Sequence, residues 1–585
     1  MADFFWVGTG NWTGTGNAGR WYTTSGGPTK QTGVPGVGDN AIFDANSGAG
    51  TCTLGGGLTG NCLNLYCNGY GAVGPTSTQI SGGSGSVLNV YGNVQLSPNQ
   101  IFDLKQYPKV VMTGAANGSI NCNGNTFGYL DIAKTAPASV TLNDDLIGVG
   151  NATLNLITGT LNANNKNVTF GAFYTGGSGT RTLTMGSGTW TMLFEGEAGT
   201  TLPINTWEIN STTGLTFNKD TATIKLLHAR NEPVTNNSQV SGLKTALTSS
   251  ATYMTLNDVT PFSTANGSTN AVLVGNEVIY YGTIIGNQLS SLTRGVGGTT
   301  VLPSVPAGTA VIGVLFGSSQ LDVPITAGVA ANIAVFDVSR FPQSGAVFIE
   351  NEVITYTGVD LVNNLFTGTS TPANSHSRLT YVLSAQAKNF WGGGLTYNDL
   401  VVADFGYKIT NTIYGSNTFS DIKNSQTGFT WTSNSNIYPG SQTLSFQWGQ
   451  TNTLTNTFTF TGTASYLQYV IGNGGTTLTL PAGGYWAVGT HSQDGGGNTG
   501  LYYIAGLTAY ISWAYINALP IPGALVTITG LYATLYLGDI TVRYWWTDID
   551  DSQTSNWVSV YDAQNGNWVP VDDSQTTTWT PITTI

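Results

Sequence analysis

The chain has 585 residues, of which only 8% are charged, whereas an average soluble globular protein has about 25%. Its 78 glycines would suit a flexible linker, but 40% hydrophobic and 11% aromatic residues exclude a disordered chain. The net charge of −12, without a run of Lys or Arg, excludes the basic surface on which nucleic-acid binding depends. We therefore expect an extended all-β protein with a surface rich in hydroxyl and amide groups.

Residues 1–50 gather aromatic side chains ahead of the first regular pattern. We expect them to form a cap that covers the open strand edges at the start of a repetitive β fold. The first residues contain no basic segment followed by an apolar one, so we expect no secretory signal and folding in a cytoplasm. The aromatic residues of this cap are Phe4, Phe5, Trp6, Trp12 and Trp21.

Residues 51–228 consist of short alternating runs separated by Asn, Asp and Gly turns. The clearest example is the stretch from Ser139 to Phe170, SVTLNDDLIGVGNATLNLITGTLNANNKNVTF. Alternation favours strands, and these residue types tolerate the left-handed backbone of tight corners. Strands this short bury their apolar side chains only by stacking on neighbouring units. The pattern predicts a parallel β-solenoid.

The cysteines and histidines do not have the spacing of a metal site. We expect the cysteines to be buried free thiols, and we expect no metal and no cofactor. They are Cys52, Cys62, Cys67 and Cys122, and the histidines are His228, His376 and His491.

Residues 229–386 interrupt the pattern with an internal duplication. MTLNDVTPF (254–262) matches IAVFDVSRF (333–341), and GNEVIYYG (275–282) matches ENEVITYTG (350–358). The second copy lacks the arginine–glycine turn that follows the first, which leaves a role for Arg294 in question. We expect two tandem small β modules inserted in one loop of the solenoid.

The solenoid pattern resumes at residues 387–500 and is followed by a hydrophobic β segment, 501–545. Within that segment, Leu501 to Leu519 carries no charge over the length of a membrane span. Its polar and tyrosine side chains favour buried or subunit-facing β structure, so we expect no membrane span.

Residues 546–585 form a tail that repeats every eleven residues. Pro570 and Pro581 fall inside the repeat units, so extended segments are favoured over a helix. Tryptophan is enriched at protein interfaces, so the tail is a candidate contact with partner proteins. The repeated tryptophans are Trp546, Trp557, Trp568 and Trp579.

Several motifs occur in the order found in one group of viral proteins. Because the motifs follow one another in that order, the chain resembles a family of β-solenoid proteins in tailed bacteriophages and related bacterial surface proteins. The resemblance implies a virion location, other virion proteins as partners and a homotrimer. The motifs are WVGTGNW (6–12), VPGVGDNAIFDANSG (34–48), LNDDL (142–146), TGTLNANNKNVTF (158–170), FWGGGLTYNDL (390–400) and GTHSQDGGGNTG (489–500).

Three functions fit these observations. The leading one is a non-enzymatic fibre or spike that attaches to the host surface, where a glycan is a possible ligand. The second is a capsid decoration or head fibre anchored through its tryptophan tail. The third is a polysaccharide depolymerase, which would need two carboxylates facing one cleft. The candidate pairs on shared strand faces are Glu195 with Glu197 and Glu350 with Glu352.

Overall fold

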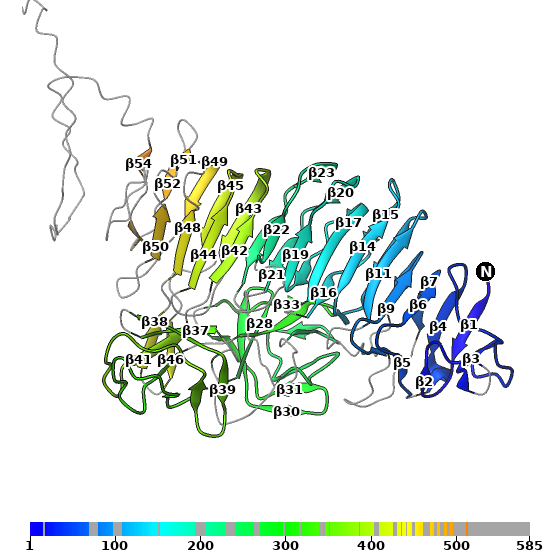
Figure 1. Cartoon of the computed structure of the whole chain (residues 1–585), viewed down its shortest axis with the longest axis horizontal. Coiled ribbons are helices and arrows are strands. Elements are labelled where there is room, and N and C mark those ends of the chain that lie inside the picture. Colours follow the sequence, from blue (N-terminus) through cyan, green and yellow to red (C-terminus); the bar gives the residue numbers. More distant parts are fainter. Residues whose placement is uncertain are drawn as a thin grey trace, which may run out of the picture. The chain divides into compact units, whose positions relative to one another are not determined.

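Short strands joined by turns make up most of the described chain, and most of them pair in parallel (Figure 1). The prediction of an all-β protein is therefore confirmed. The structure is a computed structural model. The described residues all belong to the unit Met1–Leu519. They are 1–15, 18–48, 50–68, 80–96, 108–149, 152–193, 205–227, 240–262, 270–296, 299–314, 318–338, 341, 345–349, 352–384, 387–402, 409–424, 430–433, 436–439, 442–446, 451–459, 468–472, 477–479, 485–487, 492–494 and 511–512.

The parallel strands form three long ladders, which together we call the parallel body. The first ladder contains, in pairing order, β1 (Asp3–Trp6), β4 (Asn40–Asp44), β7 (Asn64–Asn68), β10 (Val94–Gln95), β12 (Gly118–Asn121), β15 (Ser139–Leu142), β17 (Thr153–Asn162), β20 (Arg181–Thr184) and β23 (Leu215–Asn218).

The second ladder shares the long strand β17 with the first. It contains β6 (Thr59–Cys62), β9 (Val87–Val90), β11 (Lys109–Gly114), β14 (Leu130–Lys134), β17, β19 (Ala172–Thr175), β22 (Trp207–Ile209), β42 (Ala387–Trp391), β44 (Ile409–Tyr414), β48 (Gln442–Phe446), β50 (Gln468–Gly472) and β53 (Ser492–Asp494).

The third ladder contains β13 (Thr126–Phe127), β16 (Leu146–Gly148), β18 (Val168–Phe170), β21 (Thr189–Met192), β24 (Thr223–Leu226), β43 (Thr396–Val402), β45 (Thr418–Asn424), β49 (Thr451–Thr459) and β52 (Tyr485–Ala487). Smaller elements at the body are β2 (Gly10–Asn11), β3 (Trp21–Tyr22), the 3-10 helix Ala45–Ser47, β5 (Cys52–Leu54), β8 (Ile80–Gly82), β46 (Thr430–Ser433), β47 (Asn436–Pro439), β51 (Thr477–Thr479) and β54 (Ile511–Ser512).

The register along the ladders pairs apolar residues with apolar residues on the neighbouring strands. In the first ladder Val140 pairs with Leu161, and Leu161 pairs with Leu183. All three side chains are fully buried, so the alternating sequence aligns its apolar positions in one buried row. Asn164 and Asn165 turn the chain with positive φ angles of 51° and 61°, a conformation that Asn tolerates better than most residues.

Polar side chains also stack from strand to strand. Asn64 donates from Nδ2 to Oδ1 of Asn40 (2.8 Å), and Asn40 donates to Oδ1 of Asp3 (2.7 Å). Lys134 is fully buried and donates from Nζ to the backbone oxygens of Tyr91 and Thr113, each at 2.7 Å. These bonds satisfy polar groups that the parallel body would otherwise bury without partners.

Four aromatic side chains cluster at the start of the chain. Trp21 lies at the centre, with ring centroids 5.0 Å from both Trp6 and Trp12 and 5.5 Å from Phe43. The edge-to-face angles are those that aromatic pairs prefer. Four cysteines are buried in the same hydrophobic core, and none of them forms a disulfide: Cys52, Cys62, Cys67 and Cys122.

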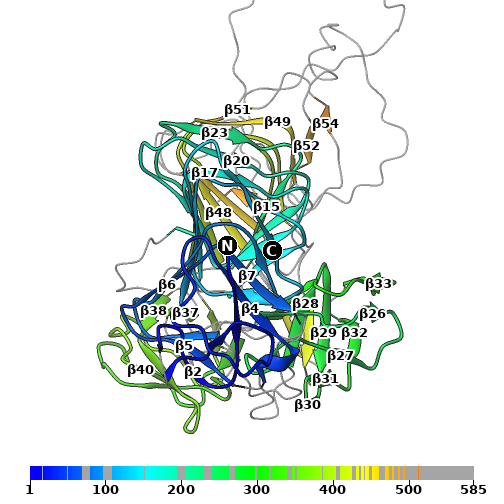
Figure 2. The same cartoon turned by 90° about the vertical axis from the view of Figure 1, so that its right-hand side faces the viewer.

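Two groups of antiparallel strands separate the halves of the parallel body. Trp207 pairs with Phe390 and Ile224 pairs with Leu400, so the ladders continue across the intervening segment. The first module contains β25 (Val240–Gly242), β26 (Leu247–Thr248), β27 (Tyr253–Thr255), β28 (Asn270–Val274), β29 (Glu277–Tyr281), β30 (Thr283–Ile285), β31 (Gln288–Ser290), β32 (Thr293–Val296), β33 (Ser304–Val305) and β34 (Ala310–Val314), several of which are seen in Figure 2.

The second module repeats this arrangement. It contains β35 (Ser318–Gln320), β36 (Ile333–Ala334), β37 (Gly345–Ile349), β38 (Glu352–Tyr356), β39 (Gly358–Asp360), β40 (Leu365–Thr367) and β41 (Tyr381–Ser384). The hairpin β37–β38 corresponds to β28–β29, and the sheet β36–β40–β39 corresponds to β27–β31–β30. Each module encloses its own hydrophobic cluster.

Candidate functional site

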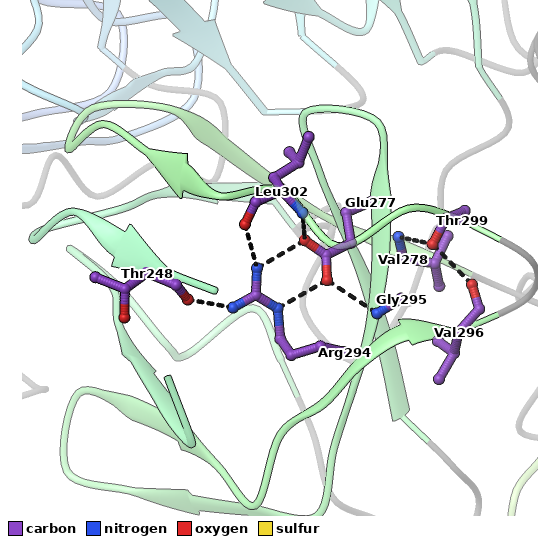
Figure 3. Close-up of polar contacts among 8 residues, drawn as sticks. All are labelled: Thr248, Glu277, Val278, Arg294, Gly295, Val296, Thr299 and Leu302. Atoms are coloured by element: carbon purple, nitrogen blue, oxygen red, sulfur yellow. Dashed lines mark hydrogen bonds and ion pairs between the residues drawn. The ribbon is translucent and has the colours of Figure 1, made fainter. Parts of the chain in front are cut away.

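Most of the candidate residues from the sequence lie outside the described residues. This applies to the four tryptophans Trp546, Trp557, Trp568 and Trp579 and to the carboxylates Glu195, Glu197 and Glu350. The other predicted carboxylate, Glu352, opens β38 in the second module. A buried polar site surrounds its duplicate, Glu277, in the first module (Figure 3).

Glu277 accepts hydrogen bonds on both carboxylate oxygens. Arg294 donates from Nε to Oε1 and from Nη2 to Oε2, each at 2.7 Å. The backbone N–H groups of Gly295 and Leu302 donate at 2.9 Å. The carboxylate thus ties both ends of the turn between Arg294 and Leu302 to strand β29. Its side chain is fully buried, and that of Arg294 is almost so.

These bonds fix the charge state of Glu277. Burial raises the pKa of its carboxyl, but the hydrogen bonds from Arg294, Leu302 and Gly295 outweigh burial and hold the pKa below its ordinary value. An ionised carboxylate with every strong acceptor position in use is not poised to donate a proton. Glu277 is therefore suited to anchoring a turn.

Glu352 anchors the corresponding turn of the second module, but with a different side-chain partner. It accepts from the backbone N–H groups of Ala373 and Asn374 and lies 3.0 Å from Nε2 of His376. His376 occupies the position of Val305, because Ile325 pairs with His376 as Leu247 pairs with Val305. The lost arginine is thus replaced by a histidine from the other end of the turn, which sequence alignment alone did not reveal.

The first module is seated directly on the parallel body. Asn257 donates from Nδ2 to the backbone oxygen of Asn123 at 3.1 Å. The backbones of Gly124 and Gly242 approach so closely that a Cβ on Gly242 would lie 2.1 Å from the Gly124 oxygen. A separate hydrophobic cluster joins the two parts: Ile147, Leu193, Leu227 and Val401 from the body, and Val240, Ala271, Leu273, Val278, Ile312 and Val314 from the module.

A cavity of about 320 Å³ lies beside this contact between the first module and the parallel body, which we call the seam. Asp144, at its edge, accepts from the backbone N–H groups of Cys122 (2.7 Å) and Asn123 (2.5 Å), which shapes the turn that the module contacts. Burial raises the pKa of the Asp144 carboxyl. Lys166 and Lys244 line the same cavity, so its charges are mixed and favour neither anions nor cations.

A row of aromatic and acidic residues crosses the outer face of the second ladder. In register, Tyr174 pairs with Glu208, Glu208 with Trp391, and Trp391 with Tyr414. Side chains in register point to the same face of parallel strands. Trp391 is 39% exposed and packs edge-on against Tyr414, with ring centroids 5.5 Å apart. No local signal unites these residues, because β22 and β42 are far apart in sequence.

No protein-family profile, curated protein or solved structure matches the chain. Within the described ranges, no group of three or more His, Cys, Asp or Glu side chains is arranged to hold a metal ion. Among the same residues, no helix is long and apolar enough to cross a membrane.

Proposed function

We propose that the chain is a structural protein of a tailed-bacteriophage virion, a fibre or spike component that attaches to the host surface without catalysing a reaction. The observation that carries the proposal is the set of parallel ladders. Two of them share strand β17 and together reach from β1 to β53, and the pairing of β22 with β42 continues across the two inserted modules. A long repetitive scaffold with side-mounted modules suits display and attachment better than it suits a single catalytic pocket.

The finer architecture that we propose is a β-solenoid, with the three ladders as its faces. The buried row of Val140, Leu161 and Leu183 and the stacked Asn40 and Asn64 support it, since stacked turns place equivalent residues above one another. Strand β17 supports it too, because its two halves belong to different ladders.

The outer row that includes Trp391 is the surface we assign to host attachment. An exposed indole offers a flat apolar face to sugar rings, so Trp391 carries the contact. Glu208, in register with it, is buried and accepts a hydrogen bond from Nδ2 of Asn205 at 3.0 Å, so its role is to support the row from beneath. One such site is weak by itself. In the homotrimer implied by the motif resemblance, and with many copies on a particle, avidity would make weak contacts effective.

Two measurements test this function. Antibody labelling of intact particles should place the protein on the tail, and labelling confined to the capsid would instead favour a head-fibre or decoration role. Particles carrying Trp391→Ala should adsorb to host cells markedly more slowly than wild-type particles. Particles carrying Val362→Ser, which removes another exposed apolar side chain, should adsorb normally. Equal adsorption of all three would contradict attachment through this row.

A further inference from the structure

The strand pairings align the two modules residue by residue on the face that seats the first module. Leu243 bridges to Leu256 in the first module, and Leu321 bridges to Val335 in the second. The next residues along the chain are therefore equivalent, so Asn257 corresponds to Phe336. In the same way, the N–H of Gly308 donates to the Leu243 oxygen, and the N–H of Leu379 donates to the Leu321 oxygen.

In the first module this face is covered by the parallel body. Gly242 and Gly308 allow the backbone of Gly124 to approach, and Asn257 bonds to Asn123. Phe336 and Leu379 of the second module correspond to Asn257 and Gly308. We call these two residues, together with the adjacent Asp322 and Arg378, the duplicate face.

The duplicate face is exposed and has a different composition. Phe336 is 47% exposed and Leu379 is 51% exposed. Arg378 lies over the Phe336 ring, 5.2 Å from its centroid, and pairs with Asp322 at 2.8 Å. Exposed aromatic, leucine and arginine side chains in one patch are typical of interface centres, where Arg and aromatic residues carry much of the binding energy.

Leu379 also adopts a conformation that disfavours leucine. Its φ angle is +71°, and the equivalent Gly308 has a φ angle of +84°. Glycine is the residue that this backbone favours, so leucine is retained there at a cost in stability. A strained, exposed leucine at the position where the first module contacts its partner indicates that the side chain itself is needed.

On strands β43 and β45 of the chain's own body, every apolar side chain is already buried, so these two strands offer this module no apolar counterpart. Val401 of β43 belongs to the cluster under the first module. The next strand, β45, has Asp421 and Lys423, which bond to Asn456 and Asp399. The duplicate face itself combines apolar residues with one cation and one anion. It can therefore pair with the same face of another copy across a two-fold axis.

We propose that the duplicate face is a subunit interface that binds the same face of a second copy of this chain. Phe336 and Leu379 form its apolar centre, and Arg378 of one subunit pairs with Asp322 of the next. A contact between identical faces is two-fold, so it joins copies in addition to the contacts of the proposed homotrimer. It can fail while the virion location and the trimer both hold.

Photo-crosslinking of the full-length protein tests the contact directly. p-Benzoylphenylalanine in place of Phe336, in a mixture of unlabelled and ¹⁵N-labelled chains, should give mixed-isotope crosslinks to residues around Asp322 or Leu379. The same group in place of the exposed Val362 should give none. Absence of mixed crosslinks from position 336, or crosslinks only to other proteins of the particle, would overturn the proposal.

Substitution by the residues of the first module gives an independent test. Phe336→Asn and Leu379→Gly should each raise the subunit dissociation constant in sedimentation by about tenfold or more, as loss of an interface centre does. Leu379→Gly should at the same time raise the unfolding temperature, since it removes the strained leucine. Weaker association with a more stable chain separates lost contact from lost folding. An unchanged dissociation constant for both variants would overturn the proposal.

Discussion

At the scale of single residues, the duplicated glutamates show how one structural task is met by different neighbours. Glu277 holds its turn with Arg294, and Glu352 holds its turn with His376. The sequence aligned the two glutamates correctly, but it could not identify the histidine. His376 approaches from the far end of the turn, and that position is valine in the first module.

Glu277→Gln should destabilise the first module by about 3 kcal/mol, because it leaves the nearly buried Arg294 without its counter-charge. Hydrogen exchange of the amides in β28 and β29 measures this loss locally. The matched control is Asp399→Asn, which breaks the more exposed pair with Lys423 and should cost less than about 1 kcal/mol. Equal effects of the two substitutions would show that Glu277 is not an anchor.

The stabilisation by Glu277 should also depend on pH. Its pKa is lowered in the folded chain, so the unfolded chain binds more protons on acidification. The contribution is complete above the ordinary carboxyl pKa and is lost as the pH falls through the lower folded pKa. The stability difference between wild type and Glu277→Gln should therefore be constant near neutrality and shrink in acid. A difference that grows below about pH 4 would contradict this sign.

Lys225 presents the opposite case. It lies buried under the first module and donates to Oδ1 of Asn276 at 3.3 Å. Burial lowers the pKa of its ammonium from 10.5 to about 8. Stability should therefore rise between about pH 8 and 10.5, where only the unfolded chain binds the proton.

Lys225→Met should remove this cost and stabilise the chain at pH 7 by up to about 3 kcal/mol, at 1.36 kcal/mol for each unit of pKa. It should also abolish the alkaline rise in stability. Chemical denaturation at pH 7 and pH 10 measures both effects. A destabilised Lys225→Met variant would mean that the bond to Asn276 outweighs the burial of charge.

At the scale of elements, the attachment of the first module depends on glycine backbones that approach one another. Gly242→Ala would place a Cβ 2.1 Å from the Gly124 oxygen, so the seam must open or shift. We expect a cost of about 1–3 kcal/mol, as for overpacking. Limited proteolysis should then release the first module faster. Gly33→Ala is the control, since a Cβ there meets nothing within 4 Å.

The elements also show what periodicity can and cannot predict. Alternating apolar residues and Asn turns predicted the strands between Ser139 and Phe170, and this stretch contains β15, β16, β17 and β18. The duplication predicted two similar modules by sequence alone. The seam around Gly124 was not predictable, because a glycine signals close approach without identifying the partner backbone.

At the scale of the whole molecule, the sequence predicted an all-β protein, and this is confirmed. The solenoid, the virion location and the homotrimer remain predictions. Neither the row through Trp391 nor the duplicate face around Phe336 could be predicted from the sequence. The residues of each surface lie at irregular spacings along the chain, so no periodic pattern identifies them. Long-range register of this kind depends on which strands stack, and that is set by the whole fold.

The most direct test of the account is a cryo-electron microscopy map of the purified protein. A solenoid predicts parallel strands stacked about 4.8 Å apart along one axis, with the chain continuing from β24 to β43 in adjacent layers. Two antiparallel sheets packed face to face in place of the three ladders would contradict the central claim.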